Sequence, residues 1–251
     1  MMRILGVVPA RYNSSRLPGK PLADICGKPM IWWVYQQAKK EKRFSDVFVA
    51  TDDERIMNVC ARLQMKAMMT SPDGACLIDR LHEVSEKMKY DYYVSINGDE
   101  PLIESENIHF VFPSEPSDTP IVRGVYRLFT DPVEVIDSAN MKIVCNENGR
   151  LIFLSRSPIP YPHKTDEFAY KKYVGIECYN KAALDFYINT QPGPIEKIED
   201  LGTLRFLEHG VDVYFSEIKS NSLSVDTMRD LEKVRHIMAK QIAHGVMEKT
   251  R

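Results

Sequence analysis

The amino-acid sequence predicts an α/β fold in which a mixed, mostly parallel sheet is flanked by helices. Strand-like and helix-like segments alternate through the first part of the chain, as they do where parallel strands are joined by crossover helices. Short apolar runs mark the strands, and apolar residues at helical spacing mark the helices. The length of 251 residues suits one domain, and we expect residues 1–251 to form it.

Four apolar runs in the first part of the chain predict buried strands, over residues 3–10, 46–51, 66–70 and 90–96. A helix is expected over residues 30–39, and Leu77, Leu81, Val84 and Met88 mark another. Asp52 is the expected N-cap of the helix between them.

The pattern changes near residue 120, where a mid-chain excursion of the sheet is expected over approximately residues 121–195. Residues 141–145 and 151–155 flank a turn-rich link and predict a β-hairpin. The other expectations are a strand over 121–128, an exposed connection over 157–172 and a strand over 173–179.

The last part of the chain predicts two helices around a strand over residues 211–218. The first helix carries the apolar residues Ile195, Ile198, Leu201, Leu204 and Leu207 and is expected to end at Gly210. The second begins at a capping box formed by Thr227 and Asp230.

Composition excludes several function classes. The chain has 33 Lys and Arg against 35 Asp and Glu, a net charge of −2, which argues against a protein that coats nucleic acid. No apolar run is long enough to span a bilayer, and no leader-like segment precedes the first strand, so we expect a cytoplasmic protein that begins near Met1. The five cysteines form no Cys-x-x-Cys pair, which disfavours a zinc site or a disulfide framework.

The loop after the first expected strand is a candidate anion site. Residues 9–20 read Pro-Ala-Arg-Tyr-Asn-Ser-Ser-Arg-Leu-Pro-Gly-Lys. Backbone N–H groups of such a turn can hold phosphate oxygens while Arg11, Arg16 and Lys20 neutralise their charge. The alternative is an exposed basic loop, but three cations with Gly and Pro fixing the backbone favour a polyanion site.

Two carboxylates are candidate metal ligands. Asp99 follows a hydrophobic strand, where it could bind Mg²⁺ or belong to an ordinary turn. Asp226 precedes a helix, where an N-cap is the plain alternative. The histidines form no metal-binding pair. No side chain lies in a motif that would mark it as a catalytic nucleophile. The sequence therefore favours direct transfer on a bound nucleotide over covalent catalysis.

Six motifs follow one another along residues 3–235. They are Pro-Ala-Arg-Tyr-Asn-Ser-Ser-Arg-Leu-Pro-Gly-Lys-Pro-Leu (9–22), Gly-Lys-Pro-Met-Ile (27–31), Val-Ala-Thr-Asp-Asp (49–53), Gly-Asp-Glu-Pro (98–101), Ser-Arg-Ser-Pro-Ile-Pro (155–160) and Val-Asp-Thr (225–227). In this order they resemble the motifs of the CMP-Kdo synthetases, the 3-deoxy-manno-octulosonate cytidylyltransferases.

The resemblance implies a Rossmann-like nucleotidyltransferase fold with a dimerisation excursion, and hence a homodimer. It implies that CMP passes from CTP to a 3-deoxy-2-keto sugar acid with release of pyrophosphate, for a bacterial surface glycan such as lipopolysaccharide or capsule, with Mg²⁺ as cofactor. The implied nucleotide-binding residues are Ala10, Arg11, Ser14, Arg16, Lys20, Arg80 and Asp99. Lys20, Asp99 and Arg16 would be catalytic, and Asp99 and Asp226 would bind the metal.

The sequence departs from the family mainly where the sugar acid binds. Asn97, Tyr173 and Glu177 stand where the family has Gln, His and Tyr, and Gly202-Thr203 replaces a Glu-Gln pair. Arg156 is kept and suits an acidic acceptor. The expected acceptor-binding residues are therefore Asn97, Arg156, Tyr173 and Glu177.

Three alternatives stay open at this point. The acceptor is Kdo held through altered contacts, or it is a different acid, because a site built around specific hydroxyl groups rarely keeps its substrate after losing their partners. A non-catalytic nucleotide-binding homologue is the third. Near the nucleotide, Cys76-Leu77-Ile78 replaces the family's Ser-Gly-Thr.

Overall fold

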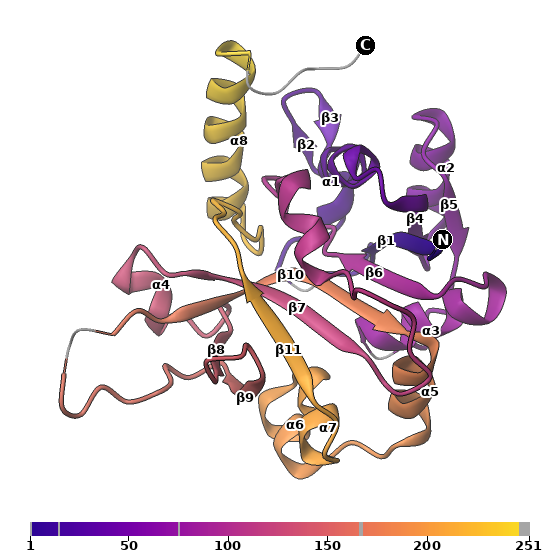
Figure 1. Ribbon diagram of the computed structural model, residues 1–251. Coiled ribbons are helices and arrows are strands. Elements are labelled where there is room, and N and C mark those ends of the chain that lie inside the picture. Colours follow the sequence, from indigo (N-terminus) through magenta and orange to yellow (C-terminus); the bar gives the residue numbers. More distant parts are fainter. Residues whose placement is uncertain (1, 15, 75, 166–167, 246–251) are drawn as a thin grey trace.

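A computed structural model describes residues 2–14, 16–74, 76–165 and 168–245 (Figure 1). Met1, the expected start, and Ser15 of the predicted anion loop lie outside these ranges. Within the described ranges, the chain forms a nine-stranded sheet. Its main path runs through β11 (Val213–Glu217), β7 (Val122–Leu128), β10 (Lys171–Asn180), β6 (Tyr92–Ile96), β1 (Ile4–Ala10), β4 (Phe44–Thr51) and β5 (Ala67–Met69).

Most neighbours along this path run parallel. β1 pairs parallel with both β4 and β6, β4 with β5, and β7 with β11. β10 is antiparallel to both of its path neighbours, β6 and β7. The predicted mixed, mostly parallel sheet is therefore confirmed.

Helices cover both faces of the sheet and bury two apolar cores (Figure 1). β1 shows why, since Ile4 and Val8 belong to one core while Leu5 and Val7 belong to the other, as the two-residue period of a strand requires. The first core includes the helices α1 (Met30–Lys40), α2 (Glu54–Arg62), α8 (Met228–Ala243) and η2 (Ser105–Val111). The second includes α3 (Leu77–Lys87), α5 (Lys181–Asn189) and α7 (Thr203–Glu208). Among the described residues, no helix has the length and apolar character needed to cross a membrane.

The predicted hairpin is confirmed as β8 (Lys142–Cys145) and β9 (Leu151–Ser155), which pair antiparallel. Gly149 occupies its turn with a φ of 78°, a conformation that favours glycine. β8 also pairs with β10, so the hairpin is attached to the main sheet. The helix α4 (Pro132–Ile136) precedes it, and both α4 and α5 were absent from the sequence-based expectations.

The prediction of a single helix before Gly210 is wrong. The segment forms two short helices, α6 (Pro194–Glu199) and α7, separated by Asp200 in the left-handed conformation with a φ of 54°. Ile198 is 84% exposed, so the apolar spacing did not mark a continuous buried face. Local backbone geometry at Asp200 therefore overrode the periodic signal.

Asp200→Gly is expected to raise the free energy of unfolding by up to about 1 kcal/mol, because glycine adopts a positive φ without a steric cost. Chemical denaturation measures the change. The backbone oxygen of Asp200 that accepts a hydrogen bond from Arg156 is retained in the variant. A lower free energy of unfolding would show that contacts of the Asp200 side chain stabilise the fold by more than its positive φ destabilises it.

The two predicted helix caps have different outcomes. Asp53, not Asp52, caps α2, and its Oδ1 accepts the backbone N–H of Arg55 at 2.8 Å. The capping box of α8 is confirmed, with Thr227 as N-cap and Asp230 as its partner. Asp52 is thereby available for a contact elsewhere.

Candidate active site

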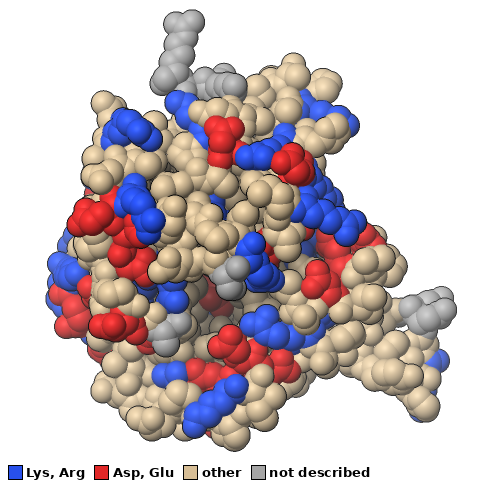
Figure 2. Space-filling model, turned by 180° about the vertical axis from the view of Figure 1, so that it is seen from behind, with Lys and Arg blue, Asp and Glu red and all other residues tan. Residues whose placement is uncertain are grey.

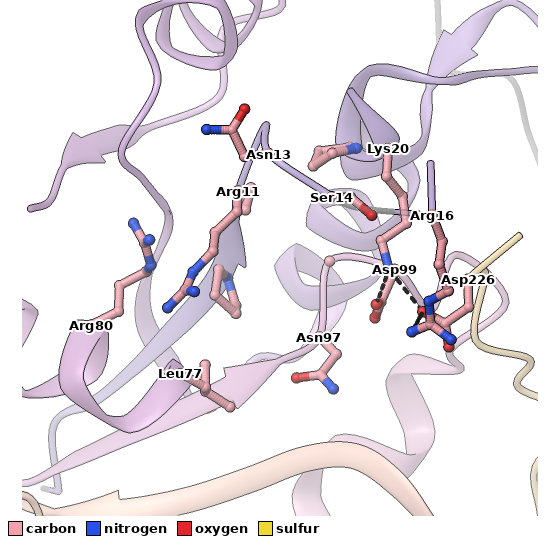
Figure 3. A pocket seen from close by; sticks show the side chains of 14 residues that line it. Arg11, Asn13, Ser14, Arg16, Lys20, Leu77, Arg80, Asn97, Asp99 and Asp226 are labelled. Atoms are coloured by element: carbon pink, nitrogen blue, oxygen red, sulfur yellow. Dashed lines mark hydrogen bonds and ion pairs between the residues drawn. The ribbon is translucent and has the colours of Figure 1, made fainter. Parts of the chain in front are cut away.

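A cavity of roughly 390 Å³ lies at the carboxyl ends of β1 and β6 (Figure 3). This is the edge at which parallel α/β sheets bind ligands. The lining residues are Pro9, Ala10, Arg11, Asn13, Ser14, Arg16, Lys20, Pro21, Leu77, Arg80, Asn97, Gly98, Asp99 and Asp226. Every predicted nucleotide-binding residue and both predicted metal ligands therefore line one cavity. Asn13 and Leu77 were not among the predicted binding residues, although Asn13 lies within the loop motif and Leu77 within the Cys76-Leu77-Ile78 run noted near the nucleotide.

The loop after β1 is folded by local hydrogen bonds. The N–H of Gly19 donates to the backbone oxygen of Tyr12 at 2.9 Å, and Gly19 has a φ of 70°. The guanidinium of Arg55 lies 3.3 Å from the centre of the Tyr12 ring. Lys20 follows as the first residue of the 3₁₀ helix η1 (Lys20–Leu22), which places its side chain in the cavity.

Lys20 joins the two predicted metal ligands. Its Nζ lies 2.6 Å from Asp99 Oδ2 and 3.2 Å from Asp226 Oδ1 (Figure 3). Burial lowers the pKa of Lys20, but the two carboxylates raise it more, so the net shift is upward and the ammonium stays charged. Two carboxylates from distant parts of the chain thus converge on one positive charge.

Asp226 is not the helix cap that its sequence position allowed. Thr227 takes that role, and its Oγ1 accepts the N–H of Asp230 at 3.3 Å. Asp226 Oδ1 instead meets Nη2 of Arg16 at 2.9 Å, as well as Lys20. The carboxylate of Asp226 therefore belongs to the cavity, where two cations face it.

Gly98 sets the position of Asp99. A Cβ atom at Gly98 would lie 2.6 Å from the backbone oxygen of Pro9, which is too close for any side chain. We expect Gly98→Ala to shift Asp99 and lower kcat/KM by about tenfold or more, since small misplacements at a reacting centre are costly. Gly74→Ala is the control, because its Cβ would meet nothing closer than 3.5 Å. Equal steady-state kinetics for the two variants would contradict this expectation.

The other end of the cavity is also basic. The buried Arg80 donates to Asp52 Oδ2 at 2.9 Å and to Thr70 Oγ1. Arg11 donates to the backbone oxygen of Gly74 at 2.6 Å, which links the anion loop to the segment before α3. Among the residues that the structure describes, the lining thus holds four cationic side chains and two carboxylates, an excess of positive charge that suits a polyphosphate.

The predicted acceptor residues are only partly brought to this cavity. Asn97 lines it, whereas Arg156, Tyr173 and Glu177 are absent from its lining. Arg156 Nε donates to the backbone oxygen of Glu199 at 2.8 Å. Their part in acceptor binding stays a prediction.

Glu177 belongs to a buried polar cluster. Its carboxylate accepts hydrogen bonds from the Tyr179 hydroxyl at 2.8 Å and from the Thr203 hydroxyl at 3.1 Å. Burial raises the pKa of Glu177, although these hydrogen bonds oppose the shift. The substitutions noted at 177 and 203 are therefore in direct contact.

The face of the molecule seen in Figure 2 is hollowed, and acidic and basic side chains gather around the hollow. This mixture agrees with the cavity lining, in which both signs of charge lie side by side. Such a surface suits a ligand that carries several phosphates together with a cation.

Comparison with known proteins assigns the chain to a family. The profile of the family described as cytidylyltransferase matches residues 5–218. The 3-deoxy-manno-octulosonate cytidylyltransferase of Escherichia coli is 37% identical over 245 residues, which cover 98% of this chain and 100% of that protein. The 8-amino-3,8-dideoxy-manno-octulosonate cytidylyltransferase of Shewanella putrefaciens is 35% identical over 244 residues, 95% of this chain and 99% of its own.

A solved structure from the same group of enzymes also matches this chain. The CMP:2-keto-3-deoxy-manno-octonic acid synthetase, complexed with CTP, superposes with a TM-score of 0.87 at 36% identity and covers 95% of this chain and 99% of its own. The Rossmann-like nucleotidyltransferase fold implied by the sequence motifs is thereby confirmed. The chain belongs to the cytidylyltransferase family, among the 3-deoxy-manno-octulosonate cytidylyltransferases and their relatives.

Proposed function

We propose that this enzyme transfers CMP from CTP to Kdo or a Kdo-like 3-deoxy-2-keto sugar acid and releases pyrophosphate, in the synthesis of a bacterial surface glycan. The observation that carries the proposal is the cavity at the ends of β1 and β6, where phosphate-binding cations and two converging carboxylates lie together. Relatives that match nearly the whole chain are named for this reaction, and the structure of one such relative was determined in complex with CTP.

The residues of the cavity suit an in-line phosphoryl-type transfer. The acceptor hydroxyl oxygen attacks the α-phosphorus of CTP, its bond to phosphorus forms, and the bond to the bridging oxygen of pyrophosphate breaks. The hydroxyl proton passes to solvent. Arg11, Ser14, Arg16 and Lys20 would hold the triphosphate and offset the charge that builds on the leaving group.

Asp99 and Asp226 fit a Mg²⁺ ion. They present hard carboxylate oxygens, and both already approach one cationic nitrogen, so the pair is arranged around positive charge. When bound, the metal would neutralise phosphate charge and polarise the phosphate oxygens. We therefore propose Mg²⁺ as the cofactor.

The acceptor is proposed as Kdo-like because the phosphate-binding part of the site is kept while the acceptor part differs. Asn97 lies in the cavity, and the strand that carries Tyr173 and Glu177 passes beside it, since the N–H of Asn97 donates to the backbone oxygen of Gly175 at 2.8 Å. Two relatives are named for acceptors that differ at C8 of the sugar, so the acceptor panel must include both.

A pyrophosphate-release assay tests the function. CTP, ATP, GTP and UTP are each combined with Kdo, 8-amino-Kdo or N-acetylneuraminate. We expect release only with CTP, and with one of the two octulosonates. Clear preference for another nucleotide would overturn the donor assignment. CTP binding without turnover of any acceptor would favour the non-catalytic homologue.

We further propose that two copies pair through the excursion. Large apolar side chains are exposed there, with Val133 68%, Ile136 74% and Tyr161 82% exposed. An apolar groove lies beside them, lined in part by Phe129, Pro132, Pro158, Phe168 and Tyr170. Such a concentration of exposed apolar surface is typical of a protein contact.

Ile136→Glu is expected to convert a dimer into a monomer, because it places a charge in the proposed apolar contact. Sedimentation equilibrium measures the change. Ile198→Glu is the matched control, since Ile198 is 84% exposed but lies on α6, outside the excursion. A monomeric wild-type chain, or a dimer that survives Ile136→Glu, would contradict the proposed interface.

A further inference from the structure

Glu100, the residue after Asp99, is buried and connects three segments that are distant in sequence. Its Oε1 accepts the N–H of Gly175 on β10 at 2.7 Å, and its Oε2 accepts the hydroxyl of Ser222 at 2.7 Å. Ser222 lies in the loop of residues 218–227, which leads from β11 to α8 and carries Asp226. Glu100 thus ties the Asp226 loop to the end of β6.

The same loop is held at two more points. The N–H of Val225 donates to the backbone oxygen of Asp99 at 2.9 Å. Further from the cavity, the carboxylate of Glu104 accepts the Ser220 hydroxyl at 2.6 Å and the Asn221 N–H at 3.1 Å. These contacts fix the path of the chain up to Asp226.

β10 approaches Glu100 very closely at Gly175. A Cβ atom at Gly175 would lie 2.5 Å from Glu100 Oε1 and 2.5 Å from Asn97 Nδ2. Only glycine lets β10 approach this carboxylate so closely. Because both carboxylate oxygens accept hydrogen bonds from different segments, a shift of Glu100 would move the Asp226 loop with it.

We infer that Glu100 is a positioning residue which, through Ser222, sets the separation of Asp99 and Asp226 and thereby the metal affinity of the pair. The inference rests on the Mg²⁺ site of the proposed function. Glu100 touches neither substrate nor metal in this role. Its effect is transmitted by the hydrogen bond from Ser222 and by the backbone bond between Val225 and Asp99.

Ser222→Ala tests the inference, because it removes one donor and leaves Glu100 in place. Mn²⁺ is titrated into enzyme saturated with CTP, free Mn²⁺ is followed by electron paramagnetic resonance, and a CTP-only blank is subtracted. We expect the dissociation constant to rise about tenfold, as the loss of one buried hydrogen bond allows. Amide exchange at Val225 should quicken, while the KM for CTP at saturating Mg²⁺ changes by less than about twofold.

Two further variants and a control separate positioning from general destabilisation. Glu100→Gln is expected to retain near wild-type Mn²⁺ affinity, since its amide oxygen can accept from Gly175 and its NH₂ can donate to Ser222. Ser222→Cys takes the place of Ser222→Ala if the latter is unstable. Its thiol is a weak donor, so its Mn²⁺ affinity should lie between those of the wild-type enzyme and a variant without a donor. Ser216→Ala is the control, because Ser216 donates to Phe110 and lies on β11, outside the loop.

Wild-type Mn²⁺ affinity and unchanged Val225 exchange in Ser222→Ala, or in Ser222→Cys if only that variant folds, would overturn the positioning role. Equal loss of affinity in Ser216→Ala would also overturn it. Failure of the wild-type enzyme itself to bind Mn²⁺ would refute the metal site, and the inference with it. The two failures are distinguishable because the second appears before any substitution is made.

Discussion

Lys20→Met is expected to lower kcat/KM by about 100- to 1000-fold, the usual cost of removing one preorganised donor from a developing charge. The Lys20 ammonium is largely buried, is held by Asp99 and Asp226, and lies in the cavity with Arg16. Methionine keeps much of the side-chain volume but removes the charge. Because the lost interaction strengthens as charge builds on the leaving pyrophosphate, most of the loss should appear in kcat.

Lys66→Met provides the matched control for this measurement. Lys66 also pairs with an aspartate, Asp46, at 2.5 Å, but it is 57% exposed and lies outside the cavity lining. Its replacement should leave steady-state kinetics unchanged. A Lys20→Met enzyme that is folded by circular dichroism and retains near-normal kcat/KM would remove Lys20 from the catalytic assignment.

The sequence allowed the sheet and the phosphate-binding side of the site to be predicted because both depend on local signals. Apolar runs located β1, β4 and β6 to within a few residues. Parallel strands place their carboxyl ends at one edge, so the loop after β1 and the turn after β6 had to meet there. Sheet topology brings the two loops to one edge, and the local fold of the loop after β1 then places Lys20 beside Asp99.

Features that depend on long-range contacts or on single backbone conformations could not be predicted in this way. The break at Asp200 depends on one left-handed residue inside an apolar pattern that continues through it. Asp52 binds Arg80 and Asp53 caps α2. The two neighbouring aspartates are chemically identical, so only the position of Arg80 in the folded chain distinguishes their roles. The bond between Glu100 and Ser222 joins residues 122 positions apart and has no sequence signal.

The acceptor side of the site shows the same limit. Arg156 was expected to bind an acidic acceptor because it is kept in the family-like motif and an arginine suits a carboxylate. Its guanidinium instead donates to backbone oxygens of Ser138, Glu199 and Asp200. Backbone acceptors supplied by the break between α6 and α7 are invisible to a motif, so the predicted role of Arg156 requires a direct binding measurement.

Asp226→Asn is expected to lower kcat by about 1000-fold or more, because the loss of a metal ligand removes several kcal/mol of transition-state stabilisation. The amide is isosteric, and Thr227 rather than Asp226 caps α8, so the melting temperature should change little. The contacts of Asp226 Oδ1 with Lys20 and Arg16 would weaken but keep a hydrogen-bond acceptor. Activity and stability should therefore separate in this variant.

Thr227→Ala is the complementary variant, because it removes the helix cap one residue away and leaves the Asp226 carboxylate intact. It should cost about 1 kcal/mol of stability while much of the activity is retained. Thermal melts and Mg²⁺-dependent pyrophosphate release are measured for both variants. If Asp226→Asn is fully active with an unchanged Mg²⁺ requirement, the carboxylate of Asp226 is not a metal ligand, and its ion pairs with Lys20 and Arg16 serve only to hold the anion loop against the loop that precedes α8.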